Sequence, residues 1–378
     1  MRVWLGLALV VTCAACSSDA ATTDPSPAPP AGVSEPATTT SAAPTTIALP
    51  STTALPSTTA LPSTTALPST TAADTTTVAP TTAAPTTVAS SRDCGAMTSG
   101  EHEIDIAGVA RTFEVVAPDR LAQPDAHLAP VIVLFHGFAS TAANIIAKTG
   151  LGELAPADGV VLVAPQAVGE PTGWHIGQPE FHDGEFTDAV LAQVRASPCI
   201  DAAAIWLAGF SAGSAWTGVY GCSHTDGIAG LLMHSGLAPP ICPADSTPDI
   251  YIVHGEADPV VPFDGGAQTV GTGTVMLQSV PESAAGWAST AGCDADPSTR
   301  TAGDRDTITT WTGCHGGHTV MFQAVADLGH AWSGGSEAPG TLNPGCVLVR
   351  VLSGADDAVA ECAPSAVNPG GGTPTGSS

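Results

Sequence analysis

Residues 209 to 213 read Gly-Phe-Ser-Ala-Gly, a Gly-x-Ser-x-Gly pattern centred on Ser211. The pattern follows an apolar run at residues 204–208 and precedes a stretch typical of a helix at residues 212–220. In a nucleophile elbow the serine occupies a strained turn between a strand and a helix, and flanking glycines leave room for close packing. This context predicts Ser211 as a nucleophile, although the five letters alone would also fit an ordinary turn.

A serine hydroxyl becomes reactive beside a histidine base that an acid holds in one tautomer. In folds with this elbow, the acid and then the base follow the serine along the chain. Asp258 lies in a glycine-containing loop after the apolar run 251–253, which is where an orienting carboxylate is expected. Asp258 is therefore the predicted acid, with Glu256 and Asp264 as weaker alternatives.

Three histidines follow the predicted acid. His330 lies in a loop of small residues, 329–335, directly after the last apolar run, so its imidazole can reach the serine. His315 and His318 flank two glycines, a pattern more typical of an exposed loop than of its alternative, an adventitious metal pair. His330 is the predicted base.

Acyl transfer also needs backbone N–H donors for the negative charge that develops on the carbonyl oxygen. One donor is the residue after the nucleophile, here Ala212, and the other comes from the loop after the third strand. The apolar run 131–135 leads into His136 and Gly137, so we expect the second donor to be the N–H of Phe138. His136 itself is predicted to be structural, because the motif uses backbone donors.

The elements that position these residues alternate between short apolar runs and longer amphipathic stretches. This alternation favours an α/β fold, a mostly parallel sheet flanked by helices. Runs 102–106 and 111–116 are separated by a short turn and predict an antiparallel N-terminal hairpin. The other predicted strands are residues 131–135, 160–164, 204–208, 228–233, 249–253 and 320–325, and the predicted helices are residues 185–195 and 212–220.

Taken in order, these segments resemble the secreted polyhydroxybutyrate depolymerase and feruloyl esterase family of the α/β-hydrolase superfamily. The resemblance covers nearly all of residues 94–352. Its motifs are His136-Gly137, Gly173-Trp174 with Asp183 and Phe186, residues 199–213, 254–262 and 287–293, and Gly329-His330-Ala331-Trp332. The resemblance implies ester hydrolysis by a triad of Ser211, Asp258 and His330 without a metal or organic cofactor. It also implies that Cys293 pairs with Cys314.

Two departures from the family pattern lie near the expected pocket. Ser214 stands where a second glycine is common, and His182-Asp183 stands where two adjacent aspartates are usual. The acyl and alcohol specificity is therefore open. The candidate pocket residues are Phe138, Trp174, His175 and Trp332, and for each tryptophan core packing is an equal alternative.

The N-terminal region predicts export. Residues 1–16 contain Arg2, an apolar stretch and small residues before Cys16, as in a lipoprotein-type signal peptide that leaves Cys16 lipidated. Simple secretion is the alternative.

Low-complexity sequence on both sides sets the domain boundaries. Residues 17–91 are rich in Thr, Ala, Pro and Ser, with four copies of Ala-Leu-Pro-Ser-Thr-Thr, and predict a disordered tether. Residues 363–378 predict a disordered tail, which leaves residues 92–362 as the catalytic domain.

Cysteine usage agrees with export. The cysteines beyond the signal peptide are Cys94, Cys199, Cys222, Cys242, Cys293, Cys314, Cys346 and Cys362. An even set of eight in an exported protein predicts four disulfides, and the lack of any Cys-x-x-Cys pair disfavours a metal site.

The chain is strongly acidic, with nine Lys and Arg against 35 Asp and Glu and a formal net charge of -26. Nucleic acid is therefore excluded as a partner, since phosphate binding needs clustered cations. A solvated surface explains the acidity best, and attraction of a cationic substrate is the minor alternative.

We therefore predict a monomeric serine esterase, secreted or anchored by a lipid at a bacterial cell surface. Its expected substrates are feruloyl, acetyl or hydroxyalkanoate esters, as small molecules or as part of a cell wall or polymer. The alternatives are an acyltransferase or peptidase with the same triad, and a non-catalytic envelope binding protein with a hydrolase fold.

Overall fold

The computed structural model describes residues 92–236, 238–270 and 273–364. The predicted signal peptide with Cys16, the tether at residues 17–91 and the tail beyond residue 364 lie outside the described residues. Within the described ranges, no helix has both the length and the apolar character needed to span a bilayer.

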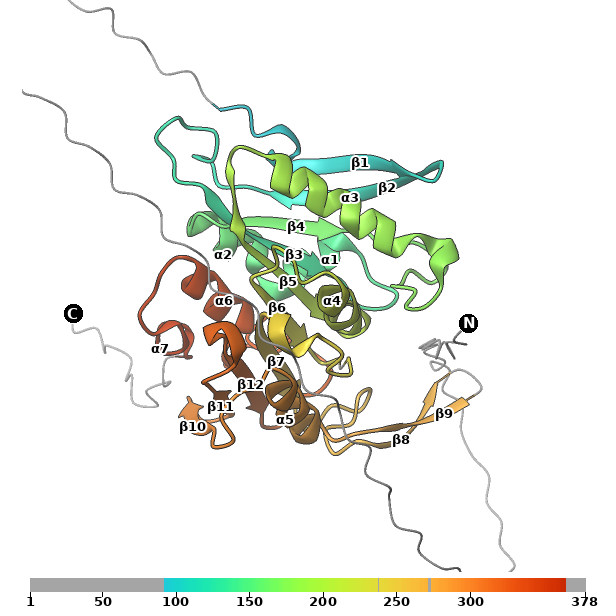
Figure 1. The fold of residues 1–378 in the computed structure, drawn as a ribbon, viewed down its shortest axis with the longest axis vertical. Coiled ribbons are helices and arrows are strands. Elements are labelled where there is room, and N and C mark those ends of the chain that lie inside the picture. Colours follow the sequence, from blue (N-terminus) through green and yellow to red (C-terminus); the bar gives the residue numbers. More distant parts are fainter. Residues whose placement is uncertain (1–91, 237, 271–272, 365–378) are drawn as a thin grey trace, which may run out of the picture. The chain divides into compact units, whose positions relative to one another are not determined.

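A ten-stranded sheet forms the centre of the described domain. Its strands are β1 (Gly100–Ile106), β2 (Val109–Val116), β3 (Ala129–Phe135), β4 (Val161–Pro165), β5 (Ile200–Phe210), β6 (Gly230–His234), β7 (Asp249–Gly255), β10 (Ser298–Ala302), β11 (Asp306–Trp311) and β12 (Val320–Val325). Their order is β1-β2-β4-β3-β5-β6-β7-β12-β11-β10, as Figure 1 shows. The six strands from β4 to β12 in this order are parallel.

The two edges of the sheet are antiparallel. The predicted N-terminal hairpin is confirmed, because β1 pairs with β2, and β2 then pairs with β4. At the other edge β11 joins β12 and β10 joins β11. The sequence prediction did not include β10 and β11, since their threonine-rich, partly exposed segments contain no long apolar run.

Helices cover both faces of the sheet. They are α1 (Ala142–Thr149), α2 (Leu151–Ala157), α3 (Asp183–Ala196), α4 (Ala212–Ser223), α5 (Val280–Thr290), α6 (Pro344–Leu352) and α7 (Ala358–Cys362). Both predicted helices are confirmed, as α3 and α4. The sequence prediction did not include the other five.

Side chains alternate across the central strands, as strand geometry requires. In β3, Val131, Val133 and Phe135 pack into a core cluster with α3, α4 and α5. Ile132 and Leu134 point to the opposite face, into a cluster with α1, α2 and α6. Burial on both faces explains why the parallel strands read as continuous apolar runs.

The smaller elements lie in the loops. They are the 3-10 turns Gly95–Met97, Pro179–Phe181, Ala244–Ser246 and His315–Gly317, and a separate two-stranded sheet of β8 (Gly266–Val270) and β9 (Gly273–Leu277).

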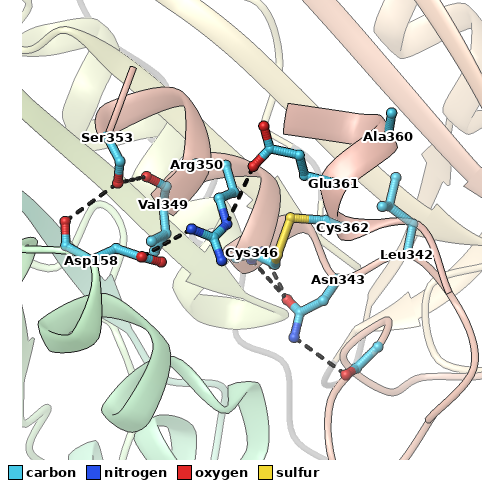
Figure 2. Close-up of a disulfide and its surroundings, with 12 residues drawn as sticks. Asp158, Leu342, Asn343, Cys346, Val349, Arg350, Ser353, Ala360, Glu361 and Cys362 are labelled. Carbon is cyan, nitrogen blue, oxygen red and sulfur yellow. Dashed lines mark hydrogen bonds and ion pairs between the residues drawn. A yellow bond between two sulfur atoms is a disulfide. The ribbon is translucent and has the colours of Figure 1, made fainter. Parts of the chain in front are cut away.

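Four disulfides hold the described domain, as the cysteine count predicts. They are Cys94–Cys199, Cys222–Cys242, Cys293–Cys314 and Cys346–Cys362, and the third is the pair that the family resemblance implies. The fourth joins α6 to α7 at the C-terminal end of the domain (Figure 2). Beside it, Arg350 of α6 contacts Asp158 at the end of α2 at 2.9 Å and Glu361 of α7 at 3.7 Å. These contacts join α6 to α2 and to α7.

Candidate active site

Ser211 lies in a sharp turn between β5 and α4. Its backbone has φ 55° and ψ -119°, a left-handed region that non-glycine residues rarely adopt. The turn is tight because a Cβ atom on Gly209 would lie 2.2 Å from the carbonyl oxygen of Gly213, and one on Gly213 would lie 2.2 Å from that of Phe135. Both glycines of the pattern are therefore required by close backbone approach, as a nucleophile elbow predicts.

The structure brings His330 and Asp258 to this serine. Nε2 of His330 lies 2.9 Å from Oγ of Ser211, and Nδ1 of His330 lies 2.8 Å from Oδ2 of Asp258. The three residues follow β5, β7 and β12, all parallel strands, so their loops meet at the carboxyl edge of the sheet.

Asp258 is buried and ionised. Its Oδ1 atom accepts N–H bonds from Val260 at 2.8 Å and Val261 at 2.9 Å. Burial by itself raises the pKa of Asp258, but the hydrogen bond and charge of His330 and these two backbone donors outweigh burial, so the pKa lies below its ordinary value. The carboxylate can only accept, which assigns the ring proton of His330 to Nδ1 and leaves Nε2 free to accept from the serine hydroxyl.

The weaker sequence candidates lie elsewhere. Glu256 and Asp264 are exposed, and so is His315. His318 lies 3.4 Å from Asp249, at the opposite end of β7 from Asp258.

His136 orients the loop that carries the second predicted donor. Its Nε2 atom accepts the N–H of Ala167 at 3.0 Å, so its proton lies on Nδ1, which donates to the carbonyl of Gly137 at 2.8 Å. Because a trans peptide is planar, the N–H of Phe138 points away from that ring. Gly137 lies against Ser211, since a Cβ atom placed on it would be 3.4 Å from Cβ of Ser211.

The other predicted donor, Ala212, is the first residue of α4. An N–H in the first turn of a helix has no acceptor within the helix and carries part of the positive end of the helix dipole. A nucleophile, a base with its acid and two backbone donors are the parts that acyl transfer requires.

The tryptophans among the pocket candidates are buried beneath the site. Trp174 is 6% exposed, and its Nε1–H donates to the carbonyl of His136 at 2.9 Å. Trp332 is 2% exposed and donates to Asn343 at 3.1 Å. Of the two alternatives, pocket lining and core packing, the burial of both tryptophans agrees with core packing.

His175 is a partly exposed pocket candidate that belongs to a buried ionic cluster. Its backbone N–H and its Nδ1 atom lie 2.8 and 3.1 Å from Oδ2 of Asp183, and its ring stacks on Phe181. The other oxygen of Asp183 pairs with Arg111 at 2.9 Å, with both side chains 2% exposed. The residue pair that departs from the family pattern thus contributes a structural carboxylate.

Sequence reasoning missed His234, the last residue of β6, which lies next to Ser211 and is fully buried. Its position at the end of an apolar run gave the only signal, and a buried histidine there is ordinarily read as part of the core. Among residues 92–364, outside the gaps, no group of three or more His, Cys, Asp or Glu side chains could hold a metal ion.

No protein-family model matches the chain. Its relatives include a protein of Nocardia uniformis that carries an esterase name, NocK, which is 26% identical and aligns over 63% of this chain and 75% of its own length. Feruloyl esterase B of Piromyces equi is 26% identical over 54% of this chain and 40% of its own length. Feruloyl esterase C of Emericella nidulans is 27% identical over 49% of this chain and 68% of its own length.

Solved structures with a similar arrangement include an acetyl xylan esterase from Aspergillus awamori, with a TM-score of 0.46, 14% identity and coverage of 62% of this chain and 94% of that chain. An S-formylglutathione hydrolase from Agrobacterium tumefaciens has a TM-score of 0.43 and 13% identity, and the match covers 70% of this chain and 95% of that chain. By these relatives the chain is a carboxylic ester hydrolase that is similar to feruloyl esterases, and its mostly parallel sheet flanked by helices is an α/β fold.

Proposed function

We propose that this carboxylic ester hydrolase works through an acyl-enzyme on Ser211. The observation that carries the proposal is the 2.9 Å contact between Oγ of Ser211 and Nε2 of His330, with Asp258 2.8 Å from the other ring nitrogen. A base placed on the hydroxyl and oriented by a buried carboxylate is the arrangement that makes serine a nucleophile.

The reaction proceeds in two balanced steps. Oγ of Ser211 attacks the ester carbonyl carbon while His330 takes the hydroxyl proton, and the oxyanion accepts hydrogen bonds from the N–H groups of Phe138 and Ala212. The C–O bond to the alcohol then breaks, and His330 returns the proton to the leaving oxygen. Water, deprotonated by His330, attacks the acyl-enzyme. The bond between the acyl carbon and Oγ of Ser211 then breaks, and His330 returns the proton to Oγ as the acid leaves. Asp258 stays ionised throughout and stabilises the imidazolium.

For the substrate we propose feruloyl-type esters first, because two of the relatives are named feruloyl esterases. Acetyl and hydroxyalkanoate esters are the alternatives. Specificity constants on a matched panel of methyl ferulate, an acetylated sugar and a hydroxybutyrate oligomer decide among them. A preference for either of the last two would overturn the feruloyl assignment.

Replacement of Ser211 by Ala tests the nucleophile. We expect hydrolysis of p-nitrophenyl acetate to disappear while the circular dichroism spectrum is unchanged, and a fluorophosphonate probe to label the wild-type protein but not the variant. Retained turnover would refute the nucleophile assignment. Absence of labelling in the wild-type protein would instead support the non-catalytic binding alternative.

Acyl transfer and peptide hydrolysis use the same three side chains. Product analysis with and without an alcohol acceptor separates transfer from hydrolysis, and a peptide substrate tests the peptidase alternative. We expect free acid as the main product in both ester reactions.

We further propose that the catalytic domain, residues 92–362, is exported and tethered through residues 17–91 to a lipid on Cys16. The four disulfides support export, because such bonds persist in oxidising compartments. Expression with its own leader in a bacterial host is the test. The wild-type protein should partition into the detergent phase and Cys16→Ser into the aqueous phase, whereas equal partitioning would favour simple secretion.

A further inference from the structure

We infer that His234 is a positioning residue that sets the distance between the nucleophile and its base. The inference rests on the proposed roles of Ser211 and His330. His234 ends β6, which lies between the strands that carry Ser211 and Asp258.

The backbone of His234 holds the nucleophile turn. Its carbonyl accepts the N–H of Ser211 at 2.9 Å. After His234 the chain turns tightly against Ser211, because a Cβ atom on Gly236 would lie 2.2 Å from the carbonyl oxygen of Ser211. The hydroxyl of Ser214, in the first turn of α4, donates to the carbonyl of Gly236. Residues 234–236 and the elbow therefore form one rigid unit.

The ring of His234 holds the loop that carries the base. Its Nε2 atom accepts the backbone N–H of Ser333 at 2.9 Å, and its ring stacks on Trp332 with 4.8 Å between centroids. Both residues lie in the loop after β12 that also contains His330. One side chain thus connects the loop of the base to a backbone that is bonded to the nucleophile.

The Ser333 contact also determines the tautomer of the ring. A backbone N–H can only donate, so Nε2 carries no proton and the proton lies on Nδ1. Nδ1 then donates to Oγ of Ser235 at 3.0 Å. Ser235 has φ 51°, so a serine occupies a strained position where its hydroxyl satisfies the ring.

The ring is held neutral beside the base. Burial lowers the pKa of His234 well below its ordinary value, the electrostatic interaction with His254 and His330 lowers it further, and Asp258 acts in the opposite direction. A second cation next to the imidazolium that His330 forms in the transition state would oppose catalysis. The neutral ring positions the loop without that penalty.

The side chain of Ser333, whose backbone N–H His234 accepts, is also buried among polar groups. Its hydroxyl contacts Thr341 at 2.8 Å and the carbonyl of Leu342 at 2.9 Å, and Gln323 of β12 donates to the same carbonyl at 2.9 Å. Ser333 is therefore fixed from both directions, and removal of the His234 acceptor frees the side that faces the nucleophile.

Two variants separate hydrogen bonding from packing. His234→Phe keeps a ring on Trp332 but removes the acceptor, whereas His234→Gln retains an acceptor near the position of Nε2. Because a displacement of about 1 Å costs about 10²-fold in rate, we expect kcat for p-nitrophenyl acetate to fall about 10²-fold in the Phe variant with KM within about 2-fold. The Gln variant should recover kcat to within about 10-fold of the wild-type value.

A double-mutant cycle tests whether the effect passes through the base. In a His330→Ala background no base remains to be positioned, so His234→Phe should change the residual rate by less than about 2-fold. If the Phe variant does not fold, as judged by circular dichroism, His234→Met takes its place in both arms.

The inference is overturned by a folded Phe or Met variant with wild-type kcat, by a Gln variant as impaired as Phe, or by a loss that persists in the His330→Ala background. Failure of the proposed function has a different signature, since Ser211→Ala would then retain wild-type turnover.

Discussion

Nε2 of His330 lies 2.9 Å from Oγ of Ser211, although 119 residues separate them in the chain. β5 and β12, which deliver the two residues, are not neighbours in the sheet, because β6 and β7 lie between them. The contact depends on a loop that returns from β12 across the carboxyl edge of the sheet and is anchored at Ser333 by His234. The geometry of the site therefore depends on both the order of the strands in the sheet and the contacts that anchor the loop.

Asp258→Asn should reduce kcat about 10³ to 10⁴-fold with little change in folding. The N–H groups of Val260 and Val261 require an oxygen at the Oδ1 position, so the amide nitrogen would face His330 and force its proton onto Nε2. Steady-state kinetics with p-nitrophenyl acetate measures the effect. Asp264→Asn, at an exposed carboxylate in the next turn, is the matched control and should retain the wild-type rate.

His136→Phe should lower kcat about 10 to 10²-fold, which is less than the loss of an oxyanion donor itself. The substitution releases the carbonyl of Gly137 and leaves the N–H of Ala167 without its acceptor, so the peptide that carries the Phe138 N–H is no longer oriented. The control is His127→Phe, at an exposed histidine before β3. Equal rates for the two variants would contradict the orienting role of His136.

Stability should fall as the pH drops below about 6.5, the ordinary pKa of histidine. Burial lowers the pKa of His136, His234 and His254, so the folded state keeps these rings neutral while the unfolded chain takes up protons. Above pH 6.5 the stability is therefore complete. Below pH 6.5 each ring lowers the free energy of unfolding by up to about 1.4 kcal/mol per pH unit.

Urea unfolding between pH 5 and 8 measures this dependence. Comparison of the wild-type protein with His234→Gln isolates one ring, because the other titrating groups are common to both. The slope below pH 6.5 should be smaller in the variant by about 1.4 kcal/mol per pH unit. Identical slopes would show that His234 is not held neutral.

Replacement of both cysteines of a disulfide by Ala should destabilise the domain more for Cys94–Cys199, separated by 105 residues, than for Cys346–Cys362, separated by 16. Chain entropy predicts losses of about 4.7 and about 3 kcal/mol, because the longer loop restricts the unfolded chain more. Denaturant unfolding of the two double variants decides the order. A reversed order would indicate that native-state contacts outweigh chain entropy.

The local pattern was sufficient for features that neighbouring residues determine. The five-residue pattern around Ser211 predicted the elbow, and the 2.2 Å approach that requires Gly209 lies within it, whereas the approach that requires Gly213 is to Phe135 in another strand. The hairpin of β1 and β2 and the helices α3 and α4 likewise follow from apolar runs and turn residues that lie close together in the chain. The even number of cysteines predicted four disulfides, and the family resemblance supplied the pair Cys293–Cys314.

Only the tertiary structure decided what depends on distant segments. The strands β10 and β11 have no apolar run of their own, since β10 is exposed apart from Ala302 and β11 buries only Asp306 and Ile308. Trp174 and Trp332 could be read as pocket or as core, and their burial depends on elements far along the chain.

His234 shows the same division most clearly. By itself the sequence predicted a strand at residues 228–233, which stops one residue before this histidine. The strand order placed that histidine beside Ser211, and the fold paired its ring with Ser333, which is 99 residues away in the chain. The local sequence pattern does not predict such a pairing, because the free energy that forms it comes from packing of the whole sheet and its loops.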